Sequence, residues 1–330
     1  MNVTDYLSED GLALLTLCCG FALPKEAATE GPAPFTLSEW NKLARQLAES
    51  PLKQPTALHG QPLDSLAQHL RLPPEEAERI VRLLERSSRL ALDLEALFSA
   101  GMWATTRIDQ HYPKKLRDSL KHQAPTVLFG AGDITLLSRG GLAVIGSRNI
   151  DAAGTAFALE TGRKAAAARL PLISGGARGT DRLAMGAALE AGGVALGVLA
   201  DSLDRTVRQP DIRQMLLDGE LVLVTPYLPA AGFSVGGAMG RNKLIYALAD
   251  YAVVVSSDFQ TGGTWAGATE ALKGNWCPVF ARDGSDVPRG NRELLKLGAT
   301  PITAPDLESN LAEWLPSHAQ HPPRERDLFE

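Results

Sequence analysis

Two stretches of sequence decide the fold: AVIGSRN at residues 143–149 and LISGGARGTDRLAMGAALEAGG at residues 172–193. In each, a short aliphatic run ends in a polar loop that carries glycine, and a segment with helical periodicity follows. Short apolar runs are typical of buried strands, and strands that alternate with helices are typical of right-handed crossovers in a parallel sheet. The sequence therefore predicts a Rossmann-like domain, whose ligands bind beyond the carboxyl ends of the strands.

The same alternation continues on both sides of these stretches. The expected strands are residues 142–145, 172–174, 194–199, 221–224, 251–255 and 278–281. The expected helices are residues 152–170, 180–190, 211–218, 242–249 and 265–272. We therefore expect an α/β fold, a Rossmann-like and mostly parallel sheet with helices on both faces.

The first hundred residues predict a small all-helical domain. Thr36 is followed three residues later by Glu39, which is the pattern of a capping box and predicts a helix through Glu49. A second helix is expected over residues 75–86, where Pro occupies the first turn. The apolar stretch at residues 11–23 has acidic rather than basic residues before it, so we expect a buried helix and not a secretory signal.

Charge supports a division into three segments. The 330 residues carry a net charge of −5, but residues 1–100 hold 9 basic and 14 acidic side chains, residues 101–305 hold 22 and 18, and residues 306–330 hold 2 and 6. We expect a helical N-terminal domain (1–100), a Rossmann-like domain (101–305) and an acidic C-terminal tail (306–330). A mildly basic middle segment is compatible with a nucleic-acid site, which depends on local and not on total charge.

Several classes of protein are excluded or disfavoured. No apolar run reaches the length of a membrane span, and Cys18, Cys19 and Cys277 form no disulfide or metal spacing, so a reducing cytoplasm is expected. His318 and His321 lie three apart in a stretch broken by prolines, so we expect no metal site. The nucleotide-binding P-loop, the G-x-G-x-x-G dinucleotide fingerprint and the G-x-S-x-G hydrolase elbow are all absent.

Three polar loops, at residues 146–149, 174–181 and 261–264, are expected at one edge of the sheet. Glycine lets a backbone approach a ligand closely, a helix start offers free N–H groups to anions, and Arg adds a planar fork for phosphate. One such loop alone is no more than a turn between a strand and a helix, but three on one edge favour a ligand that carries phosphate. Together with the helix that starts near residue 240, the candidate binding residues are Gly146, Ser147, Arg148, Asn149, Ser174, Gly175, Gly176, Arg178, Arg241, Asn242, Lys243, Gly262, Gly263 and Thr264.

The order of these motifs resembles the DNA-processing protein A family, DprA or Smf, whose Rossmann-like domain is of the SLOG type. The resemblance rests on RIDQHYPKKLRDSLKHQAPTVLFGAGD (107–133), AVIGSRN (143–149), the 172–193 stretch, VLADSLDR (198–205) and GRNKLIYALAD (240–250). The chain departs from the family at two positions before Arg241: the usual Phe-Pro is Ala238 and Met239 here, although Phe233 is nearby.

The resemblance implies a single-stranded DNA-binding protein that protects incoming DNA and helps to load RecA during natural transformation. Single-stranded DNA, RecA and a second copy of the chain are the expected partners, with no cofactor, no metal and no membrane. Phosphate contacts are expected from Arg148, Arg241 and Lys243. Arg178 has an alternative, a salt bridge to Asp181 or Asp204. Trp265 could stack on a base or pack in the core.

Two other functions remain open at this point. GGTWAGATE (262–270) is similar to the motif of LOG-type nucleoside monophosphate phosphoribohydrolases, although in a shifted register, and Glu270 would be the acid that reaches a ribose. A nucleotide-binding sensor, with the N-terminal helices as its partner-binding module, is the third possibility. The sequence leaves open whether the role is in transformation or in another transaction such as phage defence. Because no loop carries a histidine or a pair of carboxylates, we expect no catalytic residues.

Overall fold

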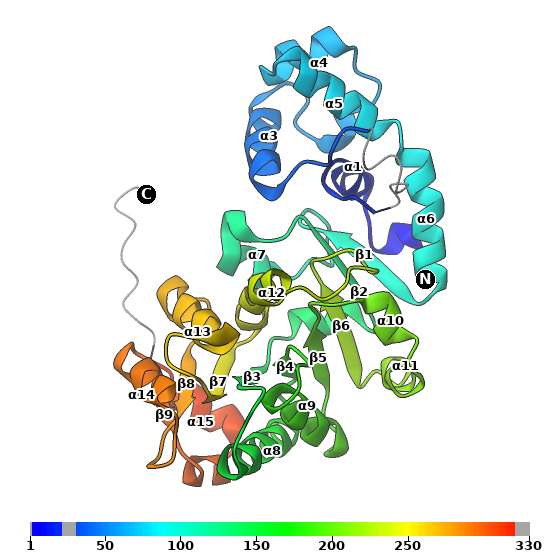
Figure 1. Ribbon diagram of the computed structural model, residues 1–330. Coiled ribbons are helices and arrows are strands. Elements are labelled where there is room, and N and C mark those ends of the chain that lie inside the picture. Colours follow the sequence, from blue (N-terminus) through cyan, green and yellow to red (C-terminus); the bar gives the residue numbers. More distant parts are fainter. Residues whose placement is uncertain (1, 22–30, 321–330) are drawn as a thin grey trace. The chain divides into compact units, whose positions relative to one another are not determined.

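The structure is a computed structural model that describes residues 2–21 and 31–320 (Figure 1). It divides into two compact units. The first comprises Met1–Tyr112, Lys121–Ala131 and Pro226–Leu228, and the second comprises Pro113–Leu120, Gly132–Thr225 and Pro229–Glu330. The first unit therefore extends past the expected boundary at residue 100.

The first unit begins with helices packed around their own apolar core. Its helices are α1 (Glu9–Cys18), α3 (Leu37–Glu49), α4 (Leu63–Leu70), α5 (Pro74–Leu84) and α6 (Ser87–Ser99). The capping box holds the start of α3, since the backbone N–H of Thr36 donates to Oε2 of Glu39 at 2.7 Å. Leu14, Trp40 and Ile80 are buried in the shared core.

The same unit contains an antiparallel hairpin that sequence periodicity did not predict. Strand β1 (Met102–Thr106) pairs with β2 (Val127–Ala131). Every residue of both strands is buried, so neither strand shows the polar–apolar alternation by which a half-exposed strand is recognised. The loop after β1 is fixed by Asp109, whose carboxylate accepts hydrogen bonds from Ser8 and Thr106.

The second unit is built on seven parallel strands among the described residues. They are β3 (Leu142–Gly146), β4 (Leu172–Ser174), β5 (Ala195–Val198), β6 (Leu221–Thr225), β7 (Tyr251–Ser256), β8 (Val279–Arg282) and β9 (Thr300–Ile302), in the order β6-β5-β4-β3-β7-β8-β9. The chain adds strands on one side of β3 and then returns to add β7 on the other. This reversal is the topological switch point at which such sheets bind ligands.

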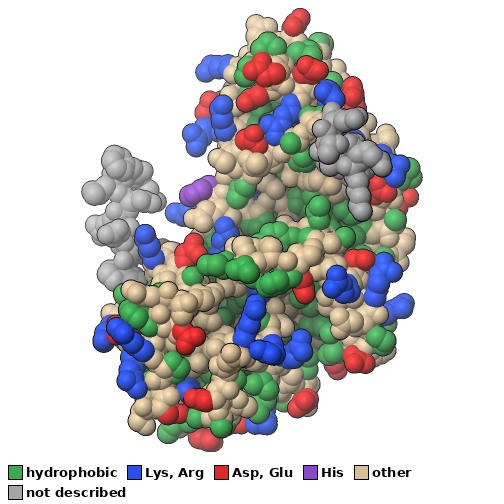
Figure 2. Space-filling view, viewed as in Figure 1, with side chains coloured by type: hydrophobic (Ala, Val, Ile, Leu, Met, Phe, Trp, Pro, Cys, Tyr) green, Lys and Arg blue, Asp and Glu red, His purple; other side chains and the backbone are tan. Residues whose placement is uncertain are grey.

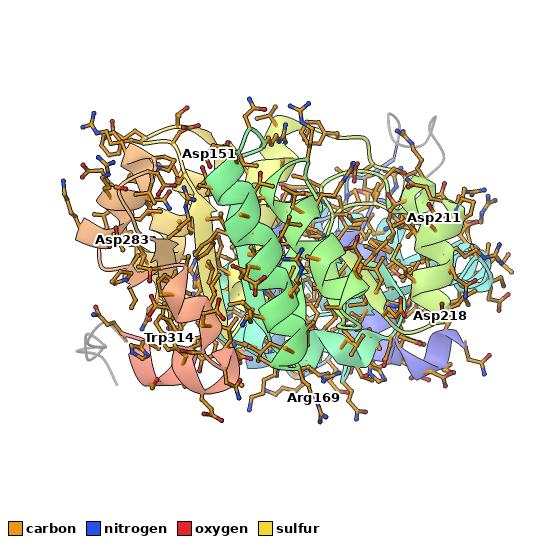
Figure 3. The ribbon with its side chains drawn as sticks, turned by 90° about the horizontal axis from the view of Figure 1, so that it is seen from below. Asp151, Arg169, Asp211, Asp218, Asp283 and Trp314 are labelled. Carbon is orange, nitrogen blue, oxygen red and sulfur yellow. The ribbon has the colours of Figure 1, made fainter. Side chains whose placement is uncertain are left out.

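Helices cover both faces of this sheet, as expected. The helices of the unit are α7 (Lys114–Leu120), α8 (Ala152–Ala167), α9 (Thr180–Glu190), α10 (Leu203–Val207), α11 (Pro210–Leu217), α12 (Val235–Leu248), α13 (Gly262–Gly274), α14 (Arg289–Lys296) and α15 (Leu311–His318). On one face, α8, α9 and α15 enclose a core with β3 and β7 (Figure 3). On the other lie α12 and α13 (Figure 1).

Helix α12 and the stretch after residue 305 differ most from their expected bounds. Helix α12 begins at Val235, seven residues before the expected start, because Oγ of Ser234 accepts from the N–H of Gly237 and caps a glycine-rich first turn. The stretch expected to be an acidic tail instead contributes Leu307, Leu311 and Leu315 to the core beneath the sheet. Its first residues are therefore part of the second unit.

The described residues contain neither a membrane-spanning helix nor a cluster of metal-binding side chains. No helix there is long and apolar enough to cross a bilayer, and residues 2–21 and 31–320 contain no group of three His, Cys, Asp or Glu side chains placed to hold a metal ion. His321 and the last two residues of the apolar stretch at 11–23 lie outside the described residues.

Candidate nucleic-acid interface

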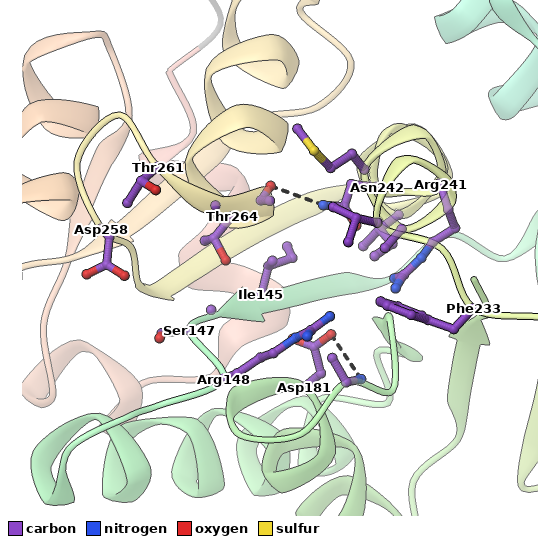
Figure 4. Close-up of a pocket in the computed structure, with 18 residues that line it drawn as sticks. Ile145, Ser147, Arg148, Asp181, Phe233, Arg241, Asn242, Asp258, Thr261 and Thr264 are labelled. Atoms are coloured by element: carbon purple, nitrogen blue, oxygen red, sulfur yellow. Dashed lines mark hydrogen bonds between the residues drawn. The ribbon is translucent and has the colours of Figure 1, made fainter. Parts of the chain in front are cut away.

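A cavity of about 380 Å³ opens where β3 and β7 end (Figure 4); we call it the loop cavity. All three predicted loops contribute to it, together with the first two turns of α12. The residues that line it are Ile145, Gly146, Ser147, Arg148, Ala177, Asp181, Phe233, Val235, Ala238, Met239, Arg241, Asn242, Ile245, Asp258, Thr261, Gly262, Gly263 and Thr264. The cavity thus occupies the switch point that the strand order defines.

The first two loops are joined to each other. Oγ1 of Thr180 donates to the carbonyl oxygen of Ser147 at 3.1 Å, and Nη2 of Arg178 donates to Oδ1 of Asn149 at 3.2 Å. Gly179, with φ +87°, makes this approach possible, because a Cβ there would lie 2.5 Å from the carbonyl oxygen of Arg148. The loops therefore form one continuous wall of the cavity.

Two buried side chains of opposite charge, Arg241 and Asp181, lie at the base of this wall. The guanidinium of Arg241, on α12, fills the space that Gly175 leaves empty: a Cβ at residue 175 would lie 2.6 Å from Cζ of Arg241. Asp181 lies close enough for the positive charge of Arg241 to stabilise its ionised carboxylate. Burial raises the pKa of Asp181 to about 6, while Arg241 and the N–H groups of Gly175 and Ala177, which donate to its Oδ2, act in the opposite direction.

The third loop is held from two sides. Nδ2 of Asn242 donates to the carbonyl oxygen of Gly263 at 3.0 Å, which ties α12 to the start of α13. Behind the loop, the fully buried Asn291 accepts from the N–H of Ser257 at 2.8 Å and donates to the carbonyl oxygen of Arg282. Sequence reasoning missed Asn291, which fixes the end of β7 from a helix 35 positions later.

One aromatic side chain reaches into the cavity from the segment before α12. Phe233 is 55% exposed, and the guanidinium of Arg148 lies over its ring at 5.6 Å from the centroid. Val235 and Met239 are also exposed apolar residues of the cavity rim. Figure 2 shows Lys and Arg side chains beside hydrophobic ones on this part of the second unit.

A second hollow adjoins the loop cavity; we call it the α9–α11 groove. Its volume is about 670 Å³, and it shares Arg148, Ala177, Phe233 and Arg241 with the loop cavity. Its other lining residues are Gly175, Gly176, Arg178, Arg182, Met185, Gly186, Leu189, Gly197, Leu199, Ala200, Asp201, Thr206, Gln209, Ile212, Met215, Leu221 and Leu223.

Most of the candidate residues from the sequence meet at these two cavities, and three do not line either of them. Ser174 is buried and its hydroxyl donates to the carbonyl oxygen of Val144. Asn149 binds Arg178 behind the loop. Lys243 is half-buried on α12, so its phosphate contact is not supported by its position.

Three alternatives from the sequence are also resolved in part by geometry. Arg178 binds Asn149, whereas Asp204 pairs with Arg208 at 2.8 Å, so among the described residues the alternative salt bridge of Arg178 is formed neither with Asp181 nor with Asp204. Trp265 is half-buried with its ring edge-on to Phe259, away from both cavities. Glu270 is exposed on α13 and lines neither cavity.

The arrangement is suited to an anion attached to a flat apolar group. Arg148 and Arg241 supply charge, the N-terminal turn of α13 presents backbone at Gly262 and Gly263, and Phe233 offers a ring face. Two carboxylates, Asp181 and Asp258, also line the loop cavity. Fold and cavity together define a Rossmann-like protein with an arginine-lined cavity at its switch point.

Comparison with known proteins assigns the family. Residues 103–312 match the model of the family described as DNA recombination-mediator protein A, and the chain belongs to this family. A Mycobacterium tuberculosis protein described as a putative DNA processing protein DprA is 28% identical over 307 residues, covering 82% of this chain and 74% of its own length. The DprA of Bacillus subtilis is 28% identical over 200 residues, covering 58% and 66%.

Solved structures agree on the fold. The crystal structure of Streptococcus pneumoniae DprA superposes with a TM-score of 0.61 at 22% identity and covers 87% of this chain and 99% of the other. A structure of Helicobacter pylori DprA, described by its single-stranded DNA binding mode, gives a TM-score of 0.54 at 24% identity and covers 66% and 97%. The expected Rossmann-like fold and family are confirmed.

Proposed function

We propose that this protein is a DNA-processing protein of the DprA type that binds single-stranded DNA in the loop cavity. The observation that carries the proposal is the convergence of Arg148, Arg241 and the start of α13 on one cavity that also holds an exposed aromatic ring. A nucleic-acid backbone supplies the phosphates and an unpaired base supplies the flat face, so sequence-independent binding needs only these two kinds of contact.

Phe233 takes the stacking role in this proposal. The family's usual Phe-Pro is replaced by Ala238 and Met239, which lie on the cavity rim within α12. The ring instead comes from the segment just before that helix and faces the same cavity. A base entering the cavity would take the position over the ring that Arg148 now holds, and would leave Arg148 free to contact the flanking phosphate.

The experiment is a titration of the protein with labelled oligothymidine and with a duplex of the same length, followed by fluorescence anisotropy at several salt concentrations. Single strands should bind more tightly than duplex. Three or four phosphate contacts predict a slope of log K against log salt of about −2 to −3. An affinity that does not change with salt would contradict the proposal.

We extend the proposal to partners and place of action. In this extension the protein protects single-stranded DNA and assists RecA in recombination, as a homodimer in the cytoplasm, and membership of the family supports it. Sedimentation with and without purified RecA tests both partners. A monomer that does not associate with RecA at micromolar concentration would remove this extension and leave DNA binding untouched.

The phosphoribohydrolase alternative is not favoured, because Glu270 is exposed and lies outside both cavities. We propose that the protein does not turn over nucleotides. Incubation with nucleoside monophosphates, beside a Glu270→Gln variant, should release no free base from either protein. Release by the parent protein that the variant lacks would restore the alternative.

A further inference from the structure

The α9–α11 groove has features that binding in the loop cavity does not use. Helix α11 buries none of its residues, and Ile212 and Met215 are only half-buried on its groove side. Met185 and Leu189 of α9 form the opposite wall. The two helices therefore leave a largely apolar channel between them. Asp211 and Asp218, labelled in Figure 3, mark helix α11.

Two glycines keep this channel open. A Cβ at Gly186 would meet no atom within 4 Å, so the absence of a side chain there creates empty space in the wall and relieves no clash. Gly197, in β5, forms part of the floor, where a Cβ would lie 2.7 Å from Cδ2 of Leu223. A glycine inside a helix lowers stability by about 1 kcal/mol relative to alanine. At residue 186 the glycine is not needed for close packing, because no atom lies within 4 Å of the position that a Cβ would take.

The rim of the groove is positively charged. Four arginines line it, namely Arg148, Arg178, Arg182 and Arg241, against one carboxylate, Asp201. Arg178 and Arg182 are exposed at the mouth, and Thr206 and Gln209 add hydrogen-bonding groups on the α11 side. An occupant should therefore combine negative charge outside the groove with flat, apolar surface and polar edges inside it.

We propose that the α9–α11 groove is a second subsite, which holds the base of a nucleotide adjoining the one bound in the loop cavity; this rests on the proposed DNA binding. The two hollows are continuous through Arg148, Ala177, Phe233 and Arg241. A strand whose phosphate lies against Arg148 can place its next phosphate near Arg178 and Arg182 and its base between α9 and α11. The thioethers of Met185 and Met215 are suited to contact an aromatic ring edge.

The test fills the groove without changing charge. Gly186→Phe places a ring in the open space of the α9 wall, and Ala167→Phe, at the exposed last residue of α8, is the matched control that lines neither cavity. Each protein is titrated with (dT)6 and with a six-unit abasic strand that has the same phosphates and no bases. Ile212→Trp fills the groove from the other wall and replaces Gly186→Phe if that variant does not fold.

The expected result is selective. Gly186→Phe should weaken (dT)6 binding about tenfold, which corresponds to about 1.4 kcal/mol and lies within the range measured for one stacked base, and should change abasic binding less than twofold. Unchanged (dT)6 binding, or an equal loss for both strands, would overturn the subsite. A parent protein that binds neither strand in a salt-dependent way would instead overturn the proposed function itself.

Discussion

The guanidinium of Arg241 lies against the backbone of Gly175, in the volume that a β-carbon at residue 175 would need. Arg241 is 6% exposed and carries charge to the junction of the loop cavity and the α9–α11 groove. The glycine of the second loop therefore acts by admitting an arginine from α12. The loop and the helix pack as one structural element although 66 positions separate the two residues.

Gly175→Ala should weaken DNA binding without removing any charge. The new methyl group displaces the guanidinium of Arg241, and overpacking of this kind costs about 1–3 kcal/mol of stability. We expect at least a tenfold loss of (dT)6 affinity by anisotropy, with a lower melting temperature by calorimetry. If the loss arises through Arg241, the same substitution in an Arg241→Ala background should cost little further affinity, because the two effects are not additive. Full additivity would show that Gly175 acts by another route.

Arg148→Ala should lower both the affinity and its salt dependence. Arg148 is exposed and lines both hollows, so its loss should remove one of the proposed phosphate contacts. We expect a loss of about 1–2 kcal/mol in binding free energy and a reduction of about 0.7 in the magnitude of the salt slope. Arg163→Ala is the charge-matched control: Arg163 is exposed on α8, pairs with Glu160 at 3.1 Å and lines neither cavity. An identical effect of both variants would reduce the role of Arg148 to overall charge.

Features that depend on neighbouring residues in the sequence could be predicted, and features that depend on contacts between distant segments could not. Helix α9 was predicted with its observed bounds because Gly179 and Thr180 mark its start locally. The start of α12 was not predicted, because a run of glycines is typical of a loop and the Ser234 cap is only a weak indication of a helix start. The hairpin of β1 and β2 was missed because both strands are wholly buried.

Convergence at the site depends on sheet order, which periodicity does not encode. Strands β3 and β7 are neighbours although more than a hundred residues separate them, and this pairing brings the first and third loops together. Asp181 and Phe233 join the same cavity only through that arrangement. The glycine-bearing ends of the expected strands identified the loops, but the contacts of Gly175 with Asp181 and Arg241 could be obtained only from the folded chain.

Asp109→Ala should destabilise the first unit substantially. The buried carboxylate accepts hydrogen bonds from the N–H and hydroxyl groups of both Ser8 and Thr106, at 2.6–2.8 Å. Its removal leaves these donors without an acceptor, which costs about 1–3 kcal/mol for each buried group that water does not reach. We expect the urea midpoint to fall by an amount equivalent to about 2–4 kcal/mol.

Asp93→Ala is the control for this comparison. Asp93 forms only a surface pair with Arg89, at 3.1 Å on successive turns of α6, and should cost less than about 0.5 kcal/mol. If the two variants unfold at the same urea concentration, the hydrogen bonds of Asp109 do not stabilise the unit.

Asp181 should make DNA binding depend on pH. Burial raises its pKa to about 6, and a phosphate bound in the loop cavity, which Asp181 lines, would raise that pKa further by repulsion. A bound form with the higher pKa takes up a proton on binding, so affinity is greatest below pH 6 and falls as the pH rises through 6 and above. Titrations of (dT)6 between pH 5 and 8 at constant ionic strength should show this decline.

Two variants identify the titrating group. Asp181→Asn keeps an oxygen that can accept from the N–H groups of Gly175 and Ala177. It cannot ionise, so its affinity for (dT)6 should stay nearly constant over the same pH range. Asp258→Asn removes the exposed carboxylate of the same cavity and should retain the decline. Persistence of the full decline in Asp181→Asn would place the titrating group elsewhere.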